Sequence, residues 1–179
     1  MRGSAEPYVP YVEPIAGGAW WTIGAAALDA GVGTVVLAGG LGVTAGLIFA
    51  LKKRYGTGVP LPPRGRGRFL RLLGITVALV AVAGTVLGYF GLGELTVPVS
   101  CAMVGVALIL LSSQLDERIF LAVGGALMVL GAVGALLALD SAGNMYPQGL
   151  VGLVAGGILW LAGAYRTGLL DEARQRVGH

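Results

Sequence analysis

The residues best suited to chemistry are three carboxylates, Asp29, Glu94 and Asp140, each of which borders a long apolar stretch. Carboxylates can hold cations or transfer protons. The simplest interpretation is that water solvates all three at the ends of helices, and the alternative is that they form an outward-facing, cation-binding rim. No ionisable residue is expected near the middle of a span, which argues against a proton pump, a voltage sensor or a transporter built on a buried carboxylate.

The residue types that most often build catalytic and metal sites are scarce. Cys101 is the only cysteine, and the only histidine, His179, is the last residue. Intrachain disulfides, cysteine or histidine ligand sets and histidine-based triads are therefore excluded. The glycine-rich runs contain no P-loop, and no dinucleotide fingerprint follows a strand. We predict no enzymatic activity, no catalytic or metal-ligating residues and no cofactor.

The composition is that of a membrane protein. Hydrophobic residues make up 56% of the chain and charged residues 12%, about half of the ~25% typical of soluble domains. This number of charged residues is too small to cover a surface that faces water. The uncharged part of the surface must therefore face lipid. The 32 glycines fit membrane helices, where small residues allow close helix approach. The sequence predicts an all-α, polytopic integral membrane protein.

Long apolar runs divide the chain into a bundle of about five transmembrane helices. Residues 1–19 are expected to form an extracytoplasmic tail, because Pro7, Pro10 and Pro14 oppose a regular helix. A transmembrane domain, residues 20–168, and a cytoplasmic tail, residues 169–179, follow. The Trp20–Trp21 pair is interpreted as an interfacial anchor, and residues 20–30 as either an interfacial segment or part of the first span. The predicted spans are residues 31–51, 69–90, 97–115, 119–139 and 149–165.

The orientation follows from the basic residues. With five spans, all but Arg2 of the 12 basic residues fall on one side of the membrane. The positive-inside rule assigns that side to the cytoplasm. The sequence therefore predicts an N-terminus outside, a C-terminus inside and a multi-pass location in the plasma membrane.

A basic cytoplasmic loop, residues 52–68, has three interpretations. Topology alone is sufficient to explain its charge, and binding to anionic lipid headgroups is a plausible addition. Nucleic acid is not expected as a partner, because the RGRGR stretch lacks interleaved aromatic residues. The residues assigned to topology and headgroup contact are Lys52, Lys53, Arg54, Arg64, Arg66 and Arg68.

Small residues four apart lie on one face of a helix and let a neighbouring helix approach. This pattern predicts helix-packing positions, whose partner could lie in the same chain or in another subunit. The positions are Gly42, Gly46, Gly131, Gly152 and Gly156. A parallel repeat of the second and third spans in the fourth and fifth is a weaker hypothesis, since glycine-rich helices resemble one another by composition.

Two functions remain open. The favoured one is a small structural or accessory subunit that packs in the lipid bilayer against other membrane proteins or against itself. It rests on the small-residue faces and on the absence of charge from the predicted mid-spans. The alternative is a small-solute or ion transporter or channel that works as an oligomer, which rests on the carboxylates, the span hydroxyls and the repeat.

Overall fold

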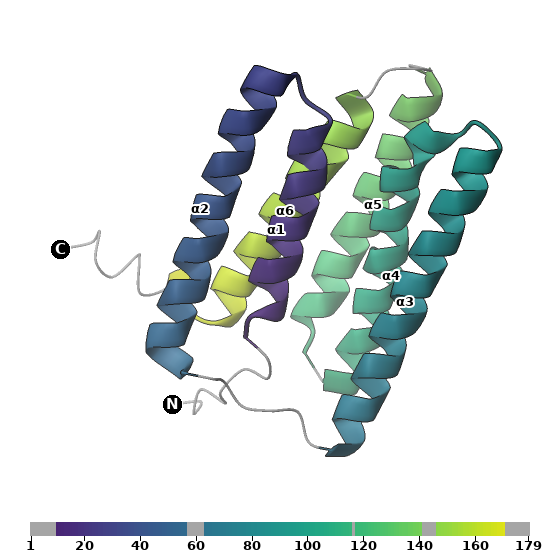
Figure 1. The fold of residues 1–179 in the computed structure, drawn as a ribbon. Helices are drawn as coiled ribbons and strands as arrows, with labels where there is room; N and C mark the ends of the chain where they lie inside the picture. The colour runs from purple at the N-terminus through teal and green to yellow at the C-terminus, as the bar shows by residue number, and fades with distance from the viewer. Residues whose placement is uncertain (1–9, 57–62, 116, 141–145, 171–179) are drawn as a thin grey trace.

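The protein is all-helical over the residues that the computed structural model describes, which are 10–56, 63–115, 117–140 and 146–170. No β-strand occurs among them (Figure 1). One short 3₁₀ helix, η1, leads into α4. The elements are α1 (Val12–Ala26), α2 (Ala30–Tyr55), α3 (Pro63–Tyr89), η1 (Gly93–Leu95), α4 (Thr96–Leu115), α5 (Ile119–Asp140) and α6 (Tyr146–Arg166).

Five helices, α2 to α6, are long and apolar enough to cross a membrane. The shortest, α4, has 20 residues, and at 1.5 Å per residue this is about 30 Å, the thickness of the hydrocarbon core. The predicted spans coincide with these helices in order, which confirms the all-α class with five spanning helices. The predicted basic loop is shorter than expected, because α2 continues to Tyr55 and α3 already begins at Pro63.

The helices form two tightly packed pairs flanked by two edge helices (Figure 1). In one pair α1 packs along α6, and in the other α4 packs along α5. The pairs join where α5 and α4 meet α6. At one edge α2 packs mainly on α1, and at the other α3 packs on α4. Among the described residues α2 and α3 do not meet, so most of the surface of both helices is left uncovered by the fold.

The N-terminal segment differs from the prediction, because residues 12–19 belong to a helix. Pro14 is the third residue of α1, and in the first turn its missing N–H would have no helical partner in any case. The helix ends in a short turn, in which the Leu28 amide donates to the Ala25 carbonyl at 3.2 Å. Asp29 then adopts an extended conformation and starts α2. The break between α1 and α2 therefore lies at residues 27–29.

The tryptophan pair belongs to the packed interior of the bundle, which corrects its interpretation as an interfacial anchor. Trp20 is buried in the main apolar core. Trp21 donates from its indole nitrogen to the Val36 carbonyl on α2 at 2.7 Å. Its ring also lies 4.7 Å from that of Trp160 on α6, measured between ring centroids. The two side chains join α1 to both of its neighbours.

The first helix also changes the relation between the two ends of the described chain. Glu13 contacts Arg166, so α1 begins at the end of the bundle where α6 finishes, and it runs antiparallel to α6. The predicted orientation placed the chain ends on opposite sides, and it rested on an odd number of spans and on the count of basic residues. In the structure α1 starts beside the end of α6, so these two helix ends lie at the same end of the bundle. Assignment of one end to the cytoplasm still rests on the charge count alone.

Glycines bring α1 and α6 into backbone contact. A Cβ atom at Gly152 would lie 2.5 Å from the Gly24 nitrogen, and one at Gly156 would lie 2.8 Å from the Gly17 carbonyl oxygen. Such approach strengthens van der Waals packing between membrane helices. The apolar core adjoins this contact. Its buried members are Trp20, Cys101, Val123, Leu127, Val151, Ala155, Leu159 and Ala162.

Alanine substitution on α6 should separate the glycines that contact another helix from those that face open space. We expect Gly152→Ala to destabilise the protein by about 1–3 kcal/mol, because the new methyl group would press on backbone atoms of α1. Gly157→Ala should change stability little, because a Cβ there meets nothing within 4 Å. Thermal unfolding of both variants in nanodiscs measures the difference, and equal melting temperatures would contradict the packing described above.

Reporter fusions test the hairpin topology. If the basic end of the bundle faces the cytoplasm, a fluorescent protein that matures only there should be bright at the N-terminus and after Gly56. The same reporter should be dark after Asp140, because α5 finishes at the end of the bundle opposite to the basic one. A dark N-terminal fusion with a bright fusion after Gly56 would show that α1 does not begin at the same end of the bundle as α2 finishes.

Candidate functional site

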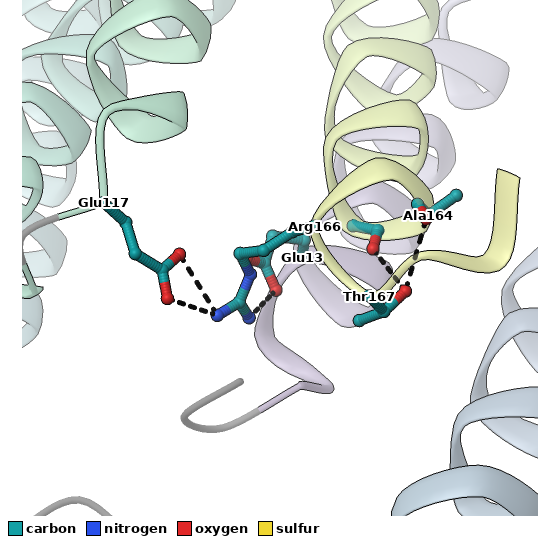
Figure 2. Close-up of polar contacts among 6 residues, drawn as sticks. Glu13, Glu117, Ala164, Arg166 and Thr167 are labelled. Carbon is teal, nitrogen blue, oxygen red and sulfur yellow. Dashed lines mark hydrogen bonds and ion pairs between the residues drawn. The ribbon is translucent and has the colours of Figure 1, made fainter. Parts of the chain in front are cut away.

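Three charged side chains meet at one end of the bundle (Figure 2). Arg166, at the end of α6, places its Nε 2.6 Å from Oε1 of Glu13 and donates from Nη2 to Oε2 at 2.8 Å. Its Nη1 lies 3.3 Å from Oε1 of Glu117, just before α5. The Glu13 and Arg166 side chains are 3% and 7% exposed, and that of Glu117 is 24% exposed. One guanidinium group therefore links the starts of α1 and α5 to the end of α6.

The placement of these charges suits the helices that carry them. Glu13 stands in the first turn of α1, where the positive end of the helix dipole favours an anion. Arg166 stands in the last turn of α6, where the negative end favours a cation. The guanidinium carbon also lies 5.4 Å from the centre of the Phe120 ring, within the range of a cation–π contact. The arrangement is that of a structural ion cluster.

Hydrogen bonds fasten other helix ends around this cluster. Trp160 donates from its indole nitrogen to the Pro14 carbonyl at 3.3 Å. Tyr55, at the end of α2, donates to the Thr167 carbonyl at 2.9 Å, and the Tyr11 hydroxyl donates to the Gly56 carbonyl. The Thr167 hydroxyl donates to the Gly163 carbonyl at 2.7 Å. These hydrogen bonds thus connect α1, α2 and α6 at the end of the bundle that carries the ion cluster.

An apolar cavity of about 550 Å³ opens beside the ion cluster. It lies between α1 and α3, which do not pack against each other, and α4 borders it as well. Glu13 and Arg166 contribute to its wall, next to Phe120. We call this space the α1–α3 groove. Its size falls within the ~300–1,000 Å³ of small-molecule sites, and its lining is almost wholly hydrocarbon.

The three predicted carboxylates occupy separate elements. Asp29 precedes α2 and is exposed, Glu94 lies in η1, and Asp140 ends α5 and is exposed. In the part of the chain that the structure describes, no three histidine, cysteine or acidic residues are grouped so that they could hold a metal ion. The predicted rim thus gains no geometric support.

The predicted packing glycines fall into two groups. Gly152 and Gly156 face α1, and a Cβ at Gly131 would lie 2.6 Å from the Pro98 carbonyl oxygen on α4. Gly42 and Gly46, on α2, face open space, since a Cβ at either would meet nothing within 4 Å. The same sequence pattern therefore serves contacts within the chain in one group and lies on an uncovered surface in the other.

The predicted basic residues gather at the end that carries the ion cluster. Lys52, Lys53 and Arg54 form the last turn of α2, and Arg64, Arg66 and Arg68 lie in the first turns of α3. The side chains of Arg66 and Arg68 are exposed, as are the three on α2. The Tyr55–Thr167 bond places the end of α2 beside the cluster, and Figure 1 shows that α3 begins at the same end of the bundle.

Sequence reasoning missed the Glu13–Arg166 pair. Glu13 was assigned to a tail, and Arg166 was counted only toward topology. One signal was available, because the apolar stretch from Trp20 to Leu51 is too long for one span at ~1.5 Å per residue. That excess pointed to two helices, and a helix extended backward from Trp20 reaches Glu13.

Comparison with known proteins gives no relative from which a role could be transferred. No protein-family model, curated protein or solved structure matches the chain. Any functional argument therefore rests on the chain's own residues and geometry.

Removal of the guanidinium group should unfold this end of the bundle. We expect Arg166→Met to cost about 3–5 kcal/mol, because two carboxylates lose their cation and Glu13 is left buried. Adding Glu13→Met should recover part of the loss. Arg118→Met, at an exposed position, serves as the control. Unfolding in nanodiscs gives the values, and an Arg166→Met variant as stable as the control would refute the structural role of the cluster.

Proposed function

We propose that this protein is a small accessory subunit of the plasma membrane, which uses α2 to pack against membrane helices of a partner subunit. The single observation behind the proposal is a stripe of uncovered glycines on α2, consisting of Gly31, Gly39, Gly42 and Gly46. A Cβ at any of the four would meet nothing within 4 Å. We call these residues the open glycine stripe.

The open glycine stripe lies on the side of α2 opposite to α1. The α1 side is marked by Gly33, where a Cβ would lie 2.6 Å from the Ala25 carbonyl oxygen, and by Gly40, where it would overlap the Trp21 ring. At 100° per residue, Gly42 stands about 160–180° around the helix from Gly33 and Gly40, and Gly46 stands about 120–140° from them. The open glycine stripe is therefore turned away from the face of α2 that contacts α1.

Lipid contact alone gives no reason for glycine at these positions. A glycine contributes no side chain to pack against acyl chains, and it favours the helix less than alanine does. Its benefit in a membrane helix is that another helix can approach its backbone. Val35 and Phe49, which are 73% and 72% exposed, lie on the same face of α2 as the stripe and would supply apolar contact beside such an approach.

Transport through the bundle has weaker support. The span hydroxyls of Thr34, Thr76 and Thr85 each donate to the carbonyl four residues earlier in the same helix, so they do not mark a solute path. The α1–α3 groove is apolar, and the carboxylates Asp29, Glu94 and Asp140 lie on separate elements.

The proposal is tested by enlarging two glycines of the stripe. We expect Gly42→Leu with Gly46→Leu to weaken association about tenfold or more, equivalent to about 1.4 kcal/mol, because the side chains hold the partner helix away. Melting of the isolated chain should not change, since neither position contacts the fold. Native mass spectrometry after gentle extraction from the native membrane measures the stoichiometry and identifies the partner.

Gly74→Leu on α3 is the matched control, because a Cβ there also meets open space. Co-purification with another polypeptide that survives Gly74→Leu and is lost in the α2 variant supports the proposal. Isolation of the wild-type chain as a monomer would overturn it. A homo-oligomer broken by the α2 variant would keep the interface but replace the partner subunit with a second copy.

A further inference from the structure

We propose that the α1–α3 groove binds an acyl chain of an anionic phospholipid from the leaflet at the basic end of the bundle, with the lipid phosphate beside Arg66. This inference concerns a different surface from the open glycine stripe and does not depend on it. It rests on the length of the groove, its position toward the basic end, its apolar lining and the charges around its mouth.

The groove has the length of one leaflet. On α1 its wall runs from Val12 to Ile23, and on α3 it runs from Phe69 to Ala81. At 1.5 Å per residue these walls measure about 16 and 18 Å. Half of the hydrocarbon core is about 15 Å. An extended acyl chain that starts at the headgroup level would therefore fill the groove over most of its length.

The groove lies toward the basic end of the bundle. Val12 and Arg166 mark that end, because α1 begins there and α6 finishes there. Leu111, near the end of α4, and Phe120, near the start of α5, line the same part. A lipid that enters from this leaflet would reach the groove with its headgroup beside the charged helix ends.

The lining selects hydrocarbon over a polar solute. Leu73 and Val77 of α3, together with Ala107 and Leu108 of α4, present only apolar atoms. The one hydroxyl on the α3 wall, that of Thr76, donates to the Leu72 carbonyl at 2.8 Å. An acyl chain needs no hydrogen-bond partner in such a space.

The charge around the groove mouth favours an anionic headgroup. Arg66 is exposed and stands three residues before Phe69, so both lie on the same side of α3. Glu13 and Glu117 oppose an anion, but Arg166 is shared between them. Further basic residues surround the same end of the bundle. The described ones with exposed side chains are Lys52, Lys53, Arg54, Arg68, Arg71 and Arg118.

Two variants of α3 test the acyl-chain site. Val77 lines the groove and is 61% exposed, whereas Val82 does not line it and is 60% exposed. Full-length protein is titrated with phosphatidylglycerol in mild detergent, and bound lipid is counted by native mass spectrometry. Val77→Trp should weaken binding about tenfold, or about 1.4 kcal/mol, because the indole fills the groove. Val82→Trp should bind like the wild type.

A second pair tests the headgroup. Arg66→Gln should lower the preference for phosphatidylglycerol over phosphatidylcholine of equal chain length by about fivefold, equivalent to ~1 kcal/mol for one basic residue at an anionic surface. Arg68→Gln, on the other side of α3, should keep most of that preference. A photoactivatable acyl chain on phosphatidylglycerol should label peptides that contain residues 12–23 or 69–81, even if one variant unfolds.

Three results would contradict the proposed lipid site. Equal binding by Val77→Trp, Val82→Trp and the wild type would show that lipid sits only around the outside of the bundle. Equal binding of phosphatidylglycerol and phosphatidylcholine to the wild type would remove the headgroup contact. Labelling confined to peptides outside α1 and α3 would remove the groove as the site.

Discussion

The docking of α1 along α6 is the interaction on which the rest of this structure depends. Backbone atoms approach through paired glycines over most of the length of α1, and the Glu13–Arg166 ion pair fixes the register at one end. Both side chains are almost fully buried, so removal of either partner would leave an uncompensated buried charge. With α1 in place, Trp21 binds α2 through the Val36 carbonyl, so the position of α2 follows from that of α1.

The same docking creates the two surfaces on which the functional proposals rest. Because α2 is held through its Gly33 and Gly40 side, its other glycines are turned away from the fold. Because α1 covers α6 and stops short of α3, the space between α1 and α3 stays open. The open glycine stripe suits a partner helix, and the α1–α3 groove suits an acyl chain. Both surfaces follow from the position of α1.

Hydropathy was enough to predict the five spanning helices, because each needs only length and apolar composition to be recognised. It was not enough for α1, whose 15 residues fall short of a span and include Pro14 and Glu13. Glycine spacing also could not say which neighbour a glycine serves. Gly152 and Gly42 belong to the same pattern, yet one touches backbone and the other touches nothing in the fold. Pairing between residues as far apart as Glu13 and Arg166 depends on topology, which local patterns do not encode.

Hydrogen–deuterium exchange of the full-length protein in nanodiscs tests the central claim most directly. If α1 lies along α6 within the bundle, the amides of residues 16–26 should exchange as slowly as those of residues 150–163. Their hydrogen bonds would then open only when the α1–α6 contact opens. Rapid exchange of residues 16–26, with slow exchange in α6, would contradict the account and place this segment outside the bundle.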